Sequence, residues 1–88
     1  MIGRMIAKEP ELYLLDEPTK GVDVEVKEEM YKIFREITSK GATVIFSSLD
    51  LSELKRVSDR ILIIRNGRVI GEFPPETPAE KLLALAGG

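Results

Sequence analysis

Hydrophobic and polar residues follow one another along the chain in blocks that predict strands separated by helices. A continuous apolar run from Glu11 to Asp16 is bounded on both sides by proline, which is typical of a strand covered on both faces in a parallel sheet. A second run, Thr43 to Ser47, is rich in β-branched residues and predicts another strand. Asp16 and Glu17 then stand at the C-terminal end of the first strand.

The segment between these strands predicts a long amphipathic helix. Asp23 suits its N-cap, the helix continues to about Ser39, and Gly41 ends it as a C-cap glycine. Apolar residues at helical spacing form the face expected to be buried: Val26, Met30, Ile33, Phe34 and Ile37. The strand, helix, strand order predicts parallel strands with a right-handed crossover, and the ligand site of such a sheet lies beyond the C-terminal ends of its strands.

A short helix and an antiparallel hairpin are expected next. Asp50, with Glu53 three residues later, resembles a capping box that opens a helix to about Val57. The pair Asn66-Gly67 stands between the apolar segments Arg60 to Arg65 and Arg68 to Phe73, which is the strongest short signal for a hairpin.

Helices are also expected at both ends of the chain. Ile2 to Lys8 has the pattern of the last turns of a helix that a proline ends. Ala79 to Ala86 predicts a short helix with three leucines on its core face: Leu82, Leu83 and Leu85. The expected fold class is therefore α/β, with parallel βαβ strands and helices followed by an antiparallel hairpin and a short helix.

Composition limits the classes of function. The 88 residues include 13 basic and 15 acidic side chains, for a net charge of −2, and they form no basic patch for nucleic-acid phosphates. Cysteine and histidine are absent, so chemistry must use carboxylates, hydroxyls and the backbone. The apolar runs are far shorter than the roughly 20 residues that span a bilayer, and the first residues have no signal-peptide pattern. The sequence therefore predicts a cytosolic chain with no nucleic-acid partner.

The pair Asp16-Glu17 is the strongest candidate for chemistry. Successive residues at the end of a strand point different ways, so the two carboxylates can take different roles. In nucleoside triphosphate hydrolysis one acid holds Mg²⁺, usually through water, and a second orients or deprotonates the attacking water. The alternative interpretation is a buried strand that ends in a polar turn, with both acids solvated.

Longer motifs decide between these interpretations. The run from Leu14 to Val24, Leu-Leu-Asp-Glu-Pro-Thr-Lys-Gly-Val-Asp-Val, closely resembles the Walker B segment and D-loop of ABC transporter ATP-binding subunits. Ser58 to Phe73 is similar to the strand and hairpin that follow in that family. Gly-Val-Asp-Val with Gly-Glu-Phe is most similar to monosaccharide importers, where the chain resembles the end of the second nucleotide-binding half. The resemblance covers essentially all 88 residues and implies part of a P-loop NTPase fold, that of the ABC ATPases.

The resemblance implies roles for individual residues. In a complete domain with ATP, Asp16 would hold Mg²⁺ through water and Glu17 would be the general base. Gly21, Val22 and Asp23 would form the D-loop that touches a second ATP-binding domain, although Asp23 also suits a helix cap and Gly21 a turn. The family also implies membrane-spanning permease subunits as partners, with the parent protein peripheral at the inner face of the cell membrane.

Leu49 departs from the family. It occupies the position of a histidine that contacts the γ-phosphate, and leucine offers neither a hydrogen bond nor a proton. We therefore expect a weakened or atypical hydrolytic site, with the adjacent Ser48 as a partial substitute. The alternative is that Leu49 is an apolar residue packed beneath the short helix.

The phosphate-binding motif G-x-x-x-x-G-K-[ST] does not occur in the 88 residues. Ile2 to Ala7 looks like the helix that follows the family's signature motif. Residues 1–88 are therefore expected to be the C-terminal portion of one ABC ATPase domain, with Walker B, D-loop and switch segment but no Walker A or signature motif. We expect the isolated chain neither to bind nor to hydrolyse ATP.

A function of another class remains as an alternative. The chain could be a stand-alone interaction module derived from an ABC ATPase, which forms a homodimer or binds another ATPase through its D-loop surface or an exposed sheet edge.

Overall fold

The computed structural model describes residues 11–87. The chain divides into two compact units: residues up to Ser48 form the first unit, and residues from Leu49 form the second. The helix predicted from Ile2 to Lys8 lies outside the described residues.

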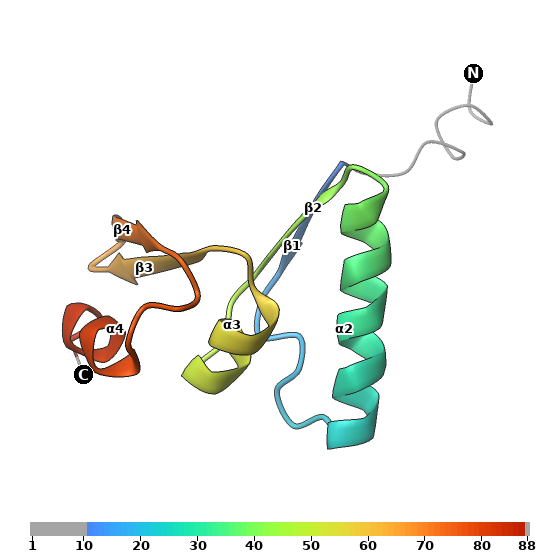
Figure 1. Cartoon of the computed structure of the whole chain (residues 1–88), viewed down its shortest axis with the longest axis horizontal. Helices are drawn as coiled ribbons and strands as arrows, with labels where there is room; N and C mark the ends of the chain where they lie inside the picture. The colour runs from blue at the N-terminus through green and yellow to red at the C-terminus, as the bar shows by residue number, and fades with distance from the viewer. Residues whose placement is uncertain (1–10, 88) are drawn as a thin grey trace. The chain divides into compact units, whose positions relative to one another are not determined.

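The first unit is a parallel strand pair joined by a helix. Strand β1 (Leu12–Leu15) pairs in parallel with β2 (Thr43–Phe46), and the helix α2 (Val24–Ser39) connects them. Leu12 lies opposite Thr43 and Leu15 opposite Phe46. Figure 1 shows α2 running alongside the two strands. The predicted βαβ arrangement with parallel strands is therefore confirmed.

One face of this strand pair is covered. The half-buried side chains alternate along both strands, as strand geometry requires, and they are Tyr13, Leu15, Val44 and Phe46. The Phe46 ring lies 5.7 Å from the ring of Phe34 on α2. On the other face Leu12, Leu14 and Ile45 are 51%, 70% and 46% exposed, and we call these three residues the exposed sheet face. The prediction that β1 is covered on both faces is wrong for this unit, because its one described helix covers one face.

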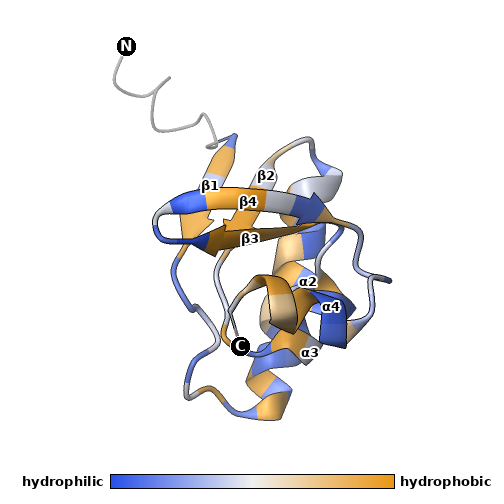
Figure 2. Cartoon of the chain, turned by 90° about the vertical axis from the view of Figure 1, so that its left-hand side faces the viewer, coloured by the Kyte–Doolittle hydropathy of each residue, from blue (hydrophilic) through white to orange (hydrophobic). Residues whose placement is uncertain are grey.

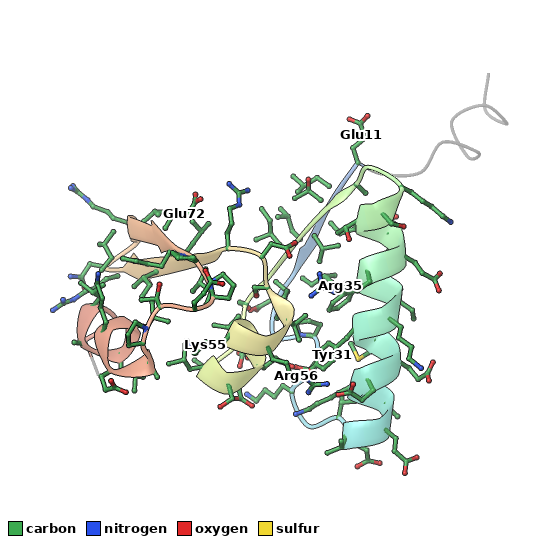
Figure 3. All side chains as sticks on the ribbon, in the orientation of Figure 1. Glu11, Tyr31, Arg35, Lys55, Arg56 and Glu72 are labelled. Carbon is green, nitrogen blue, oxygen red and sulfur yellow. The ribbon has the colours of Figure 1, made fainter. Side chains whose placement is uncertain are left out.

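The buried stripe of α2 differs from the predicted one. Tyr31 is buried at 9% exposure and projects on the side of the helix that faces the strands (Figure 3), whereas Val26 and Ile33 are about half exposed. Asp23 occupies the N-cap position, but its side chain accepts no hydrogen bond from the first turn of the helix, so its predicted capping role is not met. Gly41, at φ 97°, donates to the Thr38 carbonyl at 3.1 Å and ends the helix as predicted.

The second unit contains helix α3 (Leu51–Val57), strands β3 (Ile61–Arg65) and β4 (Arg68–Phe73), and helix α4 (Ala79–Leu85). The strands pair antiparallel, and Asn66 and Gly67 form the predicted turn with φ values of 52° and 75°. The Asp50 carboxylate accepts hydrogen bonds from the backbone N–H groups of Ser52 at 3.0 Å and Glu53 at 3.3 Å, as predicted for the start of α3.

The core of the second unit lies between the hairpin and the helices. Ile61, Ile63 and Leu82 are buried, and four half-buried residues pack against them: Leu51, Leu54, Phe73 and Leu85. Leu83 is 50% exposed, so the prediction that it covers a core face is wrong. Its immediate neighbour Leu82 takes the inward direction, and successive helical residues point about 100° apart. Figure 2 shows apolar residues along both strands of the hairpin.

Lys55 ties α3 to the proline-rich loop before α4. Its ammonium group donates a hydrogen bond to the Pro75 carbonyl at 2.7 Å and another to the Thr77 carbonyl. Thr77 is buried, and its hydroxyl donates to the Pro74 carbonyl at 2.8 Å. The loop is therefore held by polar contacts as well as by its prolines.

Candidate functional site

The two acidic residues of the Walker B-like segment follow β1 directly. Asp16 is exposed and Glu17 is half-buried. Glu17 has φ 46°, in the left-handed region that non-glycine residues seldom adopt. The Glu17 carbonyl accepts from Lys20 N–H at 3.2 Å, so the chain turns sharply immediately after the strand.

A serine hydroxyl connects the two acids. Ser47 Oγ accepts a hydrogen bond from the Glu17 backbone N–H at 2.8 Å and donates one to Asp16 Oδ1 at 2.7 Å. Ser47 N–H in turn donates to the Leu15 carbonyl at 3.0 Å, which extends the β1–β2 ladder by one bond. The carboxyl ends of the two parallel strands thus meet at a site of one hydroxyl and two acidic residues.

Sequence reasoning selected Ser48 and missed Ser47. Leu15 lies opposite Phe46 in the parallel register, so the next residue on each strand, Asp16 and Ser47, are neighbours. The register could not be read from the sequence, and only with it would Ser47 have been recognised as the neighbour of Asp16. Ser48 is half-buried at the end of the first unit.

The expected D-loop residues form the turn that leads into α2. Gly21 has φ 73°, which explains a glycine at this position. Val22 is half-buried, and its N–H donates to the Thr19 carbonyl at 3.1 Å. Asp23 is exposed and extended. Thr19 is 5% exposed and anchors this turn in the first unit, a role that its sequence context did not reveal.

Leu49 begins the second unit and is 90% exposed. The alternative that it packs beneath α3 is therefore wrong. The interpretation that remains is the one in which Leu49 replaces the family's histidine and its side chain offers no hydrogen bond.

Known proteins are similar to this chain in sequence and in fold. No protein-family model matches the chain. The chain is 38% identical over 89 residues to a ribose import ATP-binding protein of Rubrobacter xylanophilus, covering 100% of this chain and 17% of that protein. It is 39% identical over 89 residues to a xylose import ATP-binding protein of Geobacillus kaustophilus, covering 100% and 18%. A ribose import ATP-binding protein of Agrobacterium fabrum is 43% identical over 86 residues, covering 97% and 17%.

A solved structure, described as that of an ATP-binding subunit of an ABC transporter, matches with a TM-score of 0.77 and 25% identity. The match covers 90% of this chain and 37% of the solved one. This chain corresponds to part of an ABC transporter ATP-binding subunit. The predicted α/β fold of a partial ABC ATPase is thereby confirmed. The chain spans about one sixth of the length of the sugar-import relatives, at 17% and 18%.

The donor set of this ABC ATPase segment fits Mg²⁺ better than a metal that needs a full protein cage. Within residues 11–87, no three or more histidine, cysteine or acidic side chains gather at one point. Mg²⁺ typically keeps several waters and takes one or two carboxylates together with substrate phosphates. Asp16 Oδ1 is held by Ser47, so a carboxylate of fixed orientation is present for such a role.

Within residues 11–87, no helix is both long enough and apolar enough to cross a bilayer.

Proposed function

We propose that residues 1–88 contribute the acidic half of an ATP-hydrolysis site, as the C-terminal portion of one ABC ATPase domain in a sugar-import system. The observation that carries the proposal is the acid pair at the carboxyl end of β1, bridged by Ser47 Oγ at 2.7 Å and 2.8 Å. Its support is the position of the pair, since ligands of parallel α/β sheets bind beyond the carboxyl ends of the strands.

The two acids take separate parts in this mechanism. Asp16 holds Mg²⁺ through water, and the ion neutralises charge on the phosphates when it is bound. Glu17 accepts the proton of the attacking water, or orients that water, in line with the bond to be broken. Their different backbone conformations support this division, because Glu17 lies in the left-handed region at φ 46°.

The same proposal assigns partners. The turn of Gly21, Val22 and Asp23 contacts a second ATP-binding domain across the nucleotide, and permease subunits bind the assembly at the inner face of the membrane. Sugar import is supported by relatives named for ribose, xylose and arabinose. The substrate class that the parent serves is accordingly a small monosaccharide.

The isolated chain lacks the parts that bind the nucleotide. No glycine-rich phosphate loop occurs in its 88 residues, and the two acids alone repel the negative charge of ATP. We expect calorimetric titration of the isolated chain with Mg-ATP to give no binding heat. Tight binding would contradict the assignment of residues 1–88 as an incomplete site.

A segment exchange tests the proposed roles. In the ribose import ATP-binding protein of Agrobacterium fabrum, 43% identical over 86 residues, the matching segment is replaced by this chain to give an exchange protein. Glu17→Gln should lower its ATP hydrolysis by about 100-fold or more while ATP still binds. Asp16→Asn should raise the Mg²⁺ concentration needed for activity.

The matched control for both variants is Glu36→Gln, which neutralises an exposed carboxylate of α2. It should leave hydrolysis unchanged. If Glu17→Gln behaves like this control, the catalytic assignment is wrong.

A second candidate function is supported by the exposed sheet face. Leu14 is 70% exposed and lies opposite Ile45 on the neighbouring strand, and apolar side chains gathered on one face are typical of interaction surfaces. In this alternative the chain is a stand-alone module that forms a homodimer. Light scattering tests this alternative, because a strict monomer at high concentration contradicts the module.

A further inference from the structure

We infer that Ser47 is a positioning residue that couples the two acids of the site and sets the orientation of both. The inference rests on the proposed function for the roles of Asp16 and Glu17. The coupling itself rests on two hydrogen bonds, from Glu17 N–H to Ser47 Oγ at 2.8 Å and from Ser47 Oγ to Asp16 Oδ1 at 2.7 Å.

A hydroxyl can make this bridge with a single atom. Its oxygen accepts one hydrogen bond while its proton is donated in another. Asp16, an acceptor when ionised, accepts the hydrogen bond that the Ser47 hydroxyl donates, and the Glu17 amide donates the other bond to the Ser47 oxygen. Alanine has neither group, whereas threonine keeps both and suits an extended backbone.

The first bond acts on the backbone of Glu17. A glutamate at φ 46° is in a conformation that persists when surrounding contacts hold it. Ser47 holds the amide side of this residue, and the Lys20 N–H bond at 3.2 Å holds the carbonyl side. The backbone conformation fixes the direction of the Cα–Cβ bond. By holding the backbone of Glu17, Ser47 therefore sets the direction in which the Glu17 side chain projects.

The second bond acts on the side chain of Asp16. This residue is exposed, so without a partner its carboxylate would rotate among several rotamers. Donation by Ser47 to Oδ1 selects one of them. Ser47 is itself fixed by the hydrogen bond from its backbone N–H to the Leu15 carbonyl at 3.0 Å. The hydrogen bonds between the two strands therefore position Ser47, and Ser47 orients the carboxylate of Asp16, which the proposal assigns to Mg²⁺.

Nuclear magnetic resonance on the full chain tests the coupling without any nucleotide. In Ser47→Ala, the Glu17 amide should exchange with solvent about five- to tenfold faster, and the three-bond couplings of Asp16 should change from one χ1 rotamer to an average. Ser47→Thr should restore both signals. Ser52→Ala, an exposed serine in α3, should change neither. Unchanged signals in Ser47→Ala would overturn the inference.

The exchange protein tests the consequence for the reaction. Ser47→Ala should lower kcat about tenfold or more, with KM for ATP within twofold, and Ser47→Thr should recover most of the rate. A normal kcat in Ser47→Ala, with Glu17→Gln inactive, would overturn the positioning role and leave the proposed function standing. Full activity in Glu17→Gln would overturn the proposed function, while the resonance data would still decide the coupling.

Discussion

The ring of Phe73 packs directly over Gly71 in β4, so that a Cβ atom placed on Gly71 would lie 2.7 Å from two of the ring carbons. Phe73 is part of the second unit's core, and the Lys81 ammonium lies 5.7 Å from the centre of its ring. Gly71 is therefore a glycine for reasons of space.

Gly71→Ala should destabilise the second unit by about 1–3 kcal/mol, because the ring must leave its place in the core. Urea unfolding followed by circular dichroism measures this change. Val69→Thr, at a 60% exposed position of the same strand, should cost less than about 0.5 kcal/mol. In a Phe73→Leu background the cost of Gly71→Ala should fall, and an undiminished cost would show that the ring is not its cause.

Lys55→Met removes the charge that holds the loop before α4. The aliphatic stem is retained, but the carbonyls of Pro75 and Thr77 lose their donor. Hydrogen bonds from a charged group contribute about 1.5–3 kcal/mol each in favourable cases, and Lys55 is half-buried. We expect a loss of about 1–3 kcal/mol in the free energy of unfolding, together with faster amide exchange at Thr77.

Lys32→Met is the matched control for this change. Lys32 lies 3.7 Å from Glu29 with both side chains at least 70% exposed, and such surface pairs contribute little. Its effect should stay below about 0.5 kcal/mol. Equal losses in the two variants would mean that the loop contacts do not stabilise the unit.

The order of the helices and strands could be predicted from local sequence patterns, whereas the face that each of them buries could not. Asn66-Gly67 needs a positive φ at both residues, and Asp50 needs two nearby backbone donors, so these features are determined within a few residues. The buried stripe of α2 depends instead on which residues the strands present to it. Tyr31 was therefore missed, and Ile33 was placed inside although it is 52% exposed.

The candidate site also contains residues that could be predicted from local sequence and one that could not. Asp16 and Glu17 were recognisable because a strand end and a family motif coincide at them. Ser47 acts across a separation of 31 residues from Asp16, and only the register of β1 against β2 brings them together. A contact between distant segments leaves no signal in the local sequence.

The exposed sheet face should make the chain self-associate. Leu12, Leu14 and Ile45 expose apolar surface on one side of two neighbouring strands, and burying such surface contributes about 25 cal/mol per Å². We expect the mass measured by light scattering to rise with concentration. Leu14→Lys should shift this rise to concentrations about tenfold higher.

Leu83→Lys is the control for that experiment, since Leu83 is 50% exposed on α4 and is not part of the exposed sheet face. It should leave the concentration dependence unchanged. If both variants shift it equally, general hydrophobicity and not this face drives association.

Leu49→His tests whether the leucine weakens hydrolysis. Leu49 is 90% exposed, so histidine can replace it without disturbing a core, and any effect on rate reflects the new polar group. A histidine restores a hydrogen-bond donor to the γ-phosphate, and donors of this kind change rates by roughly tenfold or more. In the exchange protein we expect kcat to rise by that factor. Leu49→Phe, which adds a ring without a donor, should give no increase, and an equally slow Leu49→His would show that the missing histidine does not limit the reaction.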